Sequence, residues 1–292
     1  LAADPNQPDV CVHVARYHLS RFHLNERAGR DTTDDLALVE AALKSAPGWE
    51  RYYLRASVRL RLKDDAGALA DYNSALELGI PDRHLRERSE TFHERSHCHD
   101  RLGDLPKALA DIDAAIALRS NDAHFHAMRA GFQGRLGNDA EAVPSWRRSL
   151  AIKPDQPAAL RDLAWIYLNG PDRLRDHREG LALAERAVAL TAKPGAHALT
   201  VLGVAHYRSE NYSRAIDALN RADAVRGGMA TSTGQLFLAM CHHRLGQADR
   251  ARACYDRALD LQKAQKKPTA AQAAQFKALR AEARTVLDSP AE

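Results

Sequence analysis

The chain has 292 residues, of which 45% are hydrophobic and 27% are charged, so it contains enough apolar side chains to fold around a core rather than remain disordered. Its formal net charge is only +4, which does not indicate a nucleic-acid-binding surface. No apolar run approaches the roughly 18 residues of a membrane-spanning helix, and the first residues lack the basic and apolar regions of a signal peptide. We therefore expect neither a nucleic acid nor a membrane as a partner.

Cysteine usage bears on the cellular compartment. The cysteines are widely spaced and form no CxxC pair, so neither a disulfide framework nor a zinc knuckle is expected. Free thiols fit a reducing compartment, and we expect a cytoplasmic protein. The first residue is leucine rather than methionine, which we interpret as a sign that the chain is a piece of a longer protein. The cysteines are Cys11, Cys98, Cys241 and Cys254.

The N-terminal part predicts a pair of helices at 9–24 and 32–45, which ends at Ala42 and Pro47. From residue 49 to residue 265 one skeleton of small residues then recurs. A first small residue is followed by a second after twelve positions and by a third after seven more, and a large residue stands three positions before most of the third. The first small residues are Ala56, Ser96, Ala130, Ala164, Gly203 and Ala239; the second are Ala68, Ala108, Ala142, Ala215 and Ala251; the third are Ala75, Ala115, Ser149, Ala187, Ala222 and Ala258; and the large residues are Tyr72, Ile112, Trp146, Leu219 and Tyr255.

This spacing predicts a helix, a tight turn and a second helix in each unit. The period between the large residue and its small neighbours is helical, and the twelve-residue offset leaves room for a short turn such as RLGDL at 101–105. Small residues are expected where helices cross, because helix axes approach to about 8–10 Å only over short side chains.

Two units are longer than the others. Residues 82–90, DRHLRERSE, are helix-prone and charged, and they are predicted to lengthen the leading helix of their unit. Residues 169–179, NGPDRLRDHRE, are predicted to form an expanded turn. Pro144 falls inside a trailing helix, where we expect it to remove a hydrogen bond and kink the helix. Residues 269–287 are predicted to form one amphipathic helix that caps the stack. Its apolar stripe is Phe276, Leu279, Ala283, Val286 and Leu287.

The skeleton resembles the tetratricopeptide repeat, whose pattern W-x2-L-G-x2-Y, then A-x3-F, then A and P is matched best by residues 199–222 and 236–259. The resemblance covers nearly the whole chain and implies an all-α, right-handed superhelical solenoid of antiparallel helix pairs in a single domain. Its predicted parts are a degenerate repeat at 9–47, six clear repeats at 49–81, 89–121, 123–155, 157–194, 196–228 and 232–265, and a capping helix at 269–287.

Residues 162–288 are also similar to the repeat tails of large multidomain bacterial proteins such as planctomycete-type serine/threonine kinases. The chain contains no glycine-rich loop, HRD or DFG motif of a kinase. This likeness therefore implies a bacterial context and a larger parent protein, and it implies no kinase activity.

The resemblance also implies a binding groove, because the leading helices of such repeats line the concave face of the stack. The repeat positions that face the groove in this family are matched to the equivalent positions in each unit of this chain. Small residues at Gly131 and its neighbours leave the middle of the groove floor flat enough for an extended or helical segment. The expected groove residues are Tyr53, Ser57, Arg61, His93, His97, Arg101, Ala127, Gly131, Arg135, Arg161, Trp165, Tyr207, Arg208, Met240, His243 and Arg244.

Arginine occupies the last groove position in most units, and two interpretations are open. A column of guanidinium groups can bind carboxylates or phosphates of a peptide in a bidentate manner. Alternatively, this position precedes the turn, where a cation stabilises the helix C-terminus in any repeat of this kind. Chaperone-binding members of the family hold a terminal carboxylate with lysine and asparagine. The corresponding places here hold Tyr53 and Ser57, then His93 and His97, so binding of chaperone tails is not expected.

Residues 93–97, HERSH, match the H-E-x-x-H pattern of zinc peptidases, in which two histidines bind the metal and the glutamate, here Glu94, activates water. So short a motif matches by chance in many chains, and His93 and His97 also fall on groove positions of a regular repeat. No later glutamate or H-x-x-G-x-x-H extension supplies a third ligand. We predict no catalytic residue, no cofactor and at most weak transition-metal binding by the two histidines. His124, His126, His242 and His243 have no ligand spacing of their own and are assigned to solvent or packing.

The favoured prediction is a non-catalytic interaction or scaffold module that binds a peptide or protein segment in its groove. An alternative is a structural spacer that oligomerises through its ends and leaves the groove unused. A remote alternative is a metal-dependent hydrolase that uses His93, Glu94 and His97. An array that reads RNA bases is disfavoured because Leu54, Leu60 and similar residues on the leading helices do not form such a code.

Overall fold

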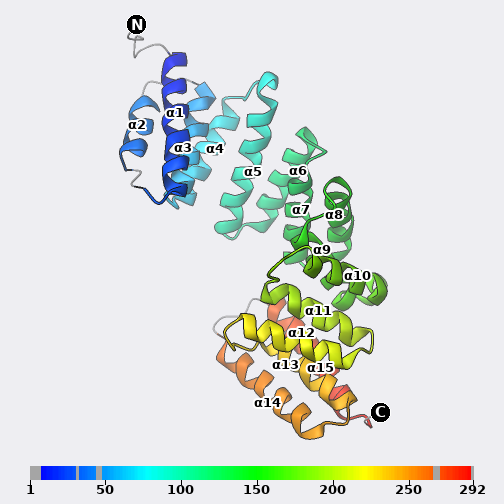
Figure 1. Ribbon diagram of the computed structural model, residues 1–292. Coiled ribbons are helices and arrows are strands. Elements are labelled where there is room, and N and C mark those ends of the chain that lie inside the picture. The colour runs from blue at the N-terminus through cyan, green and yellow to red at the C-terminus, as the bar shows by residue number, and fades with distance from the viewer. Residues whose placement is uncertain (1–7, 31–32, 44–47, 266–269, 291–292) are drawn as a thin grey trace. The chain divides into compact units, whose positions relative to one another are not determined.

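The computed structural model describes residues 8–30, 33–43, 48–265 and 270–290, and all regular secondary structure in these ranges is helical (Figure 1). The predicted all-α class is therefore confirmed. The chain divides into two compact units, residues 1–132 and 133–292, with the boundary inside one helix. None of the described helices is long and apolar enough to cross a membrane.

The first unit is built from consecutive helix pairs. The two helices of each pair pack against each other, as α1 does against α2, and each trailing helix such as α4 also contacts the next leading helix, α5. The helices are α1 (Pro8–Arg27), α2 (Thr33–Leu43), α3 (Gly48–Arg61), α4 (Asp65–Glu77), the short 3-10 helix η1 (Asp82–His84), α5 (Leu85–Arg101), α6 (Leu105–Leu118) and α7 (Ala123–Arg135), inside which the boundary lies.

The second unit continues in the same way, and its last helix differs from the rest. In this unit α9 packs on α10, α11 on α12 and α13 on α14, whereas α15 packs on α13. The helices are α8 (Asp139–Ile152), α9 (Pro157–Asn169), η2 (Asp172–Leu174), α10 (His177–Ala189), α11 (Ala196–Arg208), α12 (Tyr212–Val225), α13 (Ser232–Arg244), α14 (Ala248–Ala264) and α15 (Ala270–Leu287).

Several of the tight turns between the two helices of a pair contain a residue in the left-handed conformation. Gly103 has φ of 85° after α5, and Asp104 then caps α6 by accepting a hydrogen bond from the backbone N–H of Lys107 at 3.2 Å. In two other turns Lys63 and Glu210 take the left-handed conformation at φ of 61°, which costs roughly 1–2 kcal/mol for a residue with a Cβ. The tight geometry of the turn is therefore kept even where the glycine is absent.

The small residues of the predicted skeleton all lie at buried positions, as expected for helix crossings. Alanine side chains at Ala56, Ala68 and Ala75 are 0% exposed, and Gly203 is likewise buried. A Cβ built on Gly203 would lie only 2.6 Å from Leu219 Cγ on α12, so the two helices touch directly at this residue. Short side chains thus set the distance between the helices of a pair.

The unit at 157–194 has no small residue twelve positions after Ala164, and Gly180 takes the place of this second small residue. Gly180 lies seven residues before Ala187, as the pattern requires, but sixteen rather than twelve after Ala164. A Cβ at Gly180 would lie 2.8 Å from Leu168 Cδ2, which is again a close helix crossing. The extra residues lie between α9 and α10, where η2 forms, so the expanded turn predicted for 169–179 is confirmed.

The other lengthened segment also behaves largely as predicted. Residues 82–84 form η1, and the remainder of 82–90 extends α5 to 17 residues, compared with 14 in α3. Pro144 lies inside α8, as expected, and is exposed on its surface.

Buried carboxylates join the two helices of a pair, a feature absent from the sequence prediction. Asp71 on α4 is 2% exposed and accepts hydrogen bonds from Arg55 Nε at 2.8 Å and from Arg59 Nη1 at 2.9 Å. Asp111 on α6 is 4% exposed and accepts one from Arg95 Nε at 2.9 Å. The same arrangement therefore recurs one repeat later, and it compensates each buried negative charge.

Two glycines test whether close helix crossing limits the fold. We expect Gly203→Ala to lower the free energy of unfolding by about 1–3 kcal/mol, because its Cβ would collide with Leu219 and approach Ala215 O to 3.2 Å. Gly131→Ala is the matched control, because open space surrounds its Cβ position and alanine should stabilise the helix by about 0.4–1 kcal/mol. Urea denaturation followed by far-UV circular dichroism measures both. If both substitutions changed the free energy of unfolding in the same direction, the assignment of Gly203 to a close helix crossing would be wrong.

Candidate functional site

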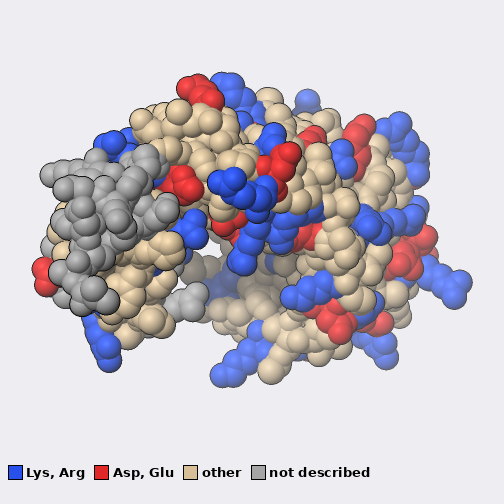
Figure 2. Space-filling view, turned by 90° about the horizontal axis from the view of Figure 1, so that it is seen from above, with Lys and Arg blue, Asp and Glu red and all other residues tan. Residues whose placement is uncertain are grey.

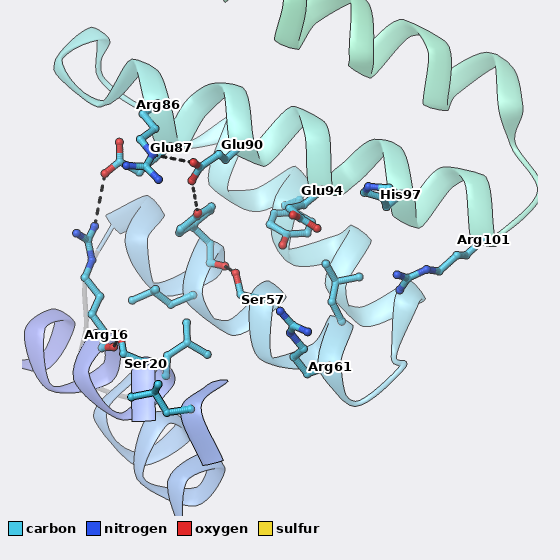
Figure 3. Close-up of a pocket in the computed structure, with 16 residues that line it drawn as sticks. Arg16, Ser20, Ser57, Arg61, Arg86, Glu87, Glu90, Glu94, His97 and Arg101 are labelled. Carbon is cyan, nitrogen blue, oxygen red and sulfur yellow. Dashed lines mark hydrogen bonds and ion pairs between the residues drawn. The ribbon is translucent and has the colours of Figure 1, made fainter. Parts of the chain in front are cut away.

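The first unit contains a cavity of about 950 Å³ between its leading helices α1, α3 and α5 (Figure 3). Leucine side chains and Tyr72 of α4 contribute apolar surface, and charged side chains of both signs surround them. The lining residues are Arg16, Leu19, Ser20 and Leu24 from α1; Tyr53, Leu54, Ser57, Leu60 and Arg61 from α3; Tyr72; and Arg86, Glu87, Glu90, Glu94, His97 and Arg101 from α5.

A row of glutamates forms one wall of this cavity. Glu87, Glu90 and Glu94 follow one another along one face of α5 at helical spacing (Figure 3). Glu90 accepts a hydrogen bond from Tyr53 OH at 3.1 Å and pairs with Arg86 Nε at 2.8 Å. The wall is therefore acidic along its length, although neighbouring groups engage part of its charge.

Arginines contribute the opposite charge. Arg16 of α1 reaches Glu87 with 4.0 Å between Nη2 and Oε1. Arg61 and Arg101 are the last residues of α3 and α5, and Arg101 Nη1 pairs with Asp65 Oδ1 at 2.8 Å. Basic and acidic side chains are interspersed elsewhere too, as the face drawn in Figure 2 shows. The cavity thus suits a ligand with both charges better than a uniformly charged one.

Burial and neighbouring charges fix the protonation states of two cavity residues. Burial, and then the negative charge of Glu90, raise the pKa of Tyr53 well above its usual range, so its hydroxyl remains a hydrogen-bond donor. Burial opposes ionisation of Glu94, but the hydrogen bond from His93 and the nearby charges of His97 and Arg61 outweigh it and lower the pKa of Glu94. Glu94 is therefore a carboxylate at neutral pH.

The predicted groove residues of the first unit fall into two groups. Tyr53, Ser57, Arg61, His97 and Arg101 line the cavity together. The repeat pattern did not predict the α1 residues of the lining, because the N-terminal pair departs from that pattern. The glutamates were not predicted either, although their helical spacing at 87, 90 and 94 was a usable signal.

The remaining predicted residues of this unit lie outside the cavity lining. His93 is half-buried beside His97, and Gly131 faces open space on α7. Ala127 is half-buried on the same helix. Arg135, which belongs to the second unit, is exposed at the end of α7.

In the second unit, α15 covers the predicted groove residues at the ends of α11 and α13. Arg208 forms an ion pair with Glu282 of α15, with 2.9 Å between Nη2 and Oε2, and its guanidinium lies over the Phe237 ring at 5.5 Å. His243 Nε2 lies 3.0 Å from the carbonyl oxygen of Ser289, just beyond α15. Leading-helix side chains that were expected to meet a partner are thus engaged within the chain.

The capping helix predicted at 269–287 therefore takes a specific position. Its stripe residues Leu279 and Ala283 are 5% and 0% exposed. Because α15 packs on α13 and reaches α11 through Arg208, it lies along leading helices of this unit. Residue 269 falls outside the described residues, and α15 begins at Ala270.

The other predicted groove residues of the second unit offer little surface. Tyr207 and Met240 are buried, at 8% and 0% exposed. Burial, and then Glu282, raise the pKa of Tyr207 to about 12. Arg161 pairs with its neighbour Asp162 at 2.6 Å, and Trp165 is half-buried. Arg244 is half-buried at the end of α13.

A histidine cluster lies next to the cavity, on α5 and α7. His93 Nε2 is 3.2 Å from His124 Nε2, and the His93 and His97 rings have centroids 4.8 Å apart. Burial, followed by the neighbouring His93, lowers the pKa of both His97 and His124. The sequence predicted no role for His124, because its distance of 27 residues from His97 matches no ligand pattern. The packing of α7 beside α5 brings His124 next to His93 and His97.

Comparisons with family models and with solved structures both find tetratricopeptide repeats. Two family models, both described as tetratricopeptide repeat, match residues 172–228 and 234–265. MamA from Desulfovibrio magneticus RS-1 superposes with a TM-score of 0.52 at 18% identity, over 62% of this chain and 98% of that chain. The hetero-tetramer Cut9–Hcn1 of APC/C gives 0.58 at 15% identity, over 97% of this chain and 57% of that chain. No curated protein matches the sequence.

A third structure, YrrB, is described as a tetratricopeptide repeat protein with an unusual peptide-binding site. It matches with a TM-score of 0.50 at 17% identity, over 61% of this chain and 86% of that chain. At such identities these similarities establish the fold alone.

Consecutive helix pairs, joined by tight turns and crossing at small residues, define an α-solenoid. The family matches show that residues 172–228 and 234–265 are tetratricopeptide repeats, and the solved structures show that the chain has the fold of such repeat proteins. Proteins of this family are in general non-catalytic modules for protein–protein interaction.

Arg208 is expected to hold α15 in place. Its side chain is 12% exposed, so Arg208→Ala removes a largely buried ion pair, and we expect unfolding free energy to fall by about 2–4 kcal/mol. Amide hydrogen exchange in 275–287 should accelerate first. Arg221→Ala is the control, because Arg221 is 52% exposed and lies 3.7 Å from Asp217, so a change below about 0.5 kcal/mol is expected. Unchanged protection of α15 in Arg208→Ala would show that apolar packing alone holds it.

Proposed function

We propose that this protein is a non-catalytic module that binds a peptide or protein segment in the cavity between α1, α3 and α5. The observation that carries this proposal is the cavity itself, which at about 950 Å³ is large and is lined by leading helices of consecutive repeats. Its volume lies at the upper end of the roughly 300–1,000 Å³ range of ligand pockets, which is enough for several side chains.

The lining favours a segment of mixed charge. A lysine or arginine of the ligand can pair with Glu87 or Glu94 on the acidic wall, and a carboxylate can approach Arg61 and Arg101 at the far end of the leading helices. Apolar ligand side chains can contact the leucines of α1 and α3. Several of these charges already have partners, so binding must exchange existing ion pairs. We therefore expect the charges to contribute more to the choice of ligand than to the strength of binding.

In the second unit α15 covers the leading helices, which supports placing the ligand in the first unit. There α15 engages Arg208 and His243, so a ligand at α11 and α13 would have to displace it. The fold shared with YrrB makes a peptide the first ligand class to test. We further propose, from the resemblance to planctomycete-type repeat tails, that the module belongs to a larger bacterial protein of the cytoplasm.

A peptide library with a cavity-filling variant tests the proposal. Linear peptides displayed on phage are selected against the whole chain, and the enriched peptides are measured by fluorescence polarisation. Ser57→Trp fills the cavity from α3, and we expect it to weaken binding by roughly tenfold or more, about 1.4 kcal/mol. Ser213→Trp, at an exposed position on α12, is the matched control and should leave affinity unchanged.

The composition of the enriched peptides supplies a second readout. Peptides that carry a basic residue should lose affinity with Glu87→Lys but not with Glu185→Lys, an exposed site on α10. If Ser57→Trp weakens the binding of none of the selected peptides, the cavity is not the binding site. The alternative of a structural spacer that oligomerises through its ends is then the better description.

A further inference from the structure

We propose that His93, His97 and His124 form a binding site for a late first-row divalent metal ion, with Zn²⁺ as the reference ion. The site belongs to the first unit, beside the cavity, and is separate from the proposed peptide-binding function. One ring nitrogen from each histidine lies within 4.8 Å of the other two. Two helices supply these ligands, and the H-E-x-x-H match at 93–97 accounts for only two of them.

The three imidazoles already lie close to the spacing that a tetrahedral metal ion requires. Zinc binds imidazole nitrogens at about 2.0–2.1 Å, so two ligands of a tetrahedral site lie roughly 3.3 Å apart. The Nε2 atoms of His93 and His124 are already 3.2 Å apart. His97 stands one helical turn after His93 on the same face of α5, and its nitrogen needs to approach by roughly 1.5 Å, which rotation about its side-chain bonds can provide.

Neighbouring groups already orient the ligands. Glu94 Oε1 lies 3.4 Å from His93 Nδ1, which leaves His93 Nε2 to face His124. A carboxylate on the second ring nitrogen is the usual support for a metal-bound histidine. The backbone N–H of His124 donates to Asp122 Oδ1 at 3.0 Å, and this bond fixes the first turn of α7. The rings of His93 and Phe125 pack with centroids 5.3 Å apart.

The chemistry of the three ligands determines which ion fits the site. Imidazole nitrogens favour zinc, cobalt, nickel and copper, whereas magnesium and calcium prefer oxygen ligands. Three imidazoles leave a fourth position for water or another donor. Because His97 also lines the cavity, the metal would lie at its edge and would join α5 to α7. A bound ion should therefore stabilise the first unit against unfolding.

Cobalt titration of the whole, tag-free chain tests the site, because Co²⁺ in a tetrahedral site gives visible d–d absorption and Zn²⁺ should displace it. We expect one saturable Co²⁺ per chain and a loss of affinity of roughly tenfold or more for each of His93→Asn, His97→Asn and His124→Asn. His197→Asn, at an exposed position on α11, should leave binding unchanged. Cys98→Ser should also leave it unchanged, which excludes the neighbouring thiol as a ligand.

The variant His124→Asn decides between two sites. If it binds Co²⁺ as tightly as the unmodified chain while His93→Asn and His97→Asn do not, only the pair on α5 holds the ion and the three-histidine site is wrong. Absence of saturable binding, or equal binding by all four histidine variants, also overturns the proposal. The metal alone is the probe, so none of these outcomes depends on whether a peptide binds in the cavity.

Discussion

The close crossing of two helices over small side chains is the constraint on which the rest of this structure depends. At Gly203 even one added carbon would meet Leu219, and at Gly180 it would meet Leu168. Alanine and serine at the equivalent places are buried completely, as at Ala108 and Ser149. Because the helices of a pair approach so closely, each pair is a rigid element that can bury its apolar faces only against its neighbours.

This packing brings the leading helices of consecutive pairs side by side, which creates the sites described above. The cavity arises because α1, α3 and α5 present one face each to the same space. The histidine cluster arises because the start of α7 lies beside the middle of α5. Neither site depends on a loop, so its side chains are held by helices whose positions the core fixes. Binding at such a site requires little ordering of the backbone.

The two units use their leading helices differently. In the first, the charged residues of α5 line open space, and Asp71 and Asp111 keep arginines engaged between the paired helices. In the second, α15 lies on α13, and Glu282 takes the guanidinium of Arg208. The arginine at the end of a leading helix is therefore an ion-pair partner within the chain at Arg101 and Arg208. These ion pairs favour a structural role for the column of arginines at the ends of the leading helices.

The sequence by itself determined the repeat, because short side chains at helical spacing record where helices cross, and it determined the expanded turn before α10 and the amphipathic character of α15. The resemblance to the repeat family also predicted that Tyr53, Ser57 and His97 face the groove. Only the tertiary structure decided that α1 and three glutamates complete the cavity, that α15 covers Arg208, and that His124 lies beside His93. The physical reason is that repeat spacing reports contacts within a helix pair, whereas contacts between pairs join residues at sequence distances that no local period encodes.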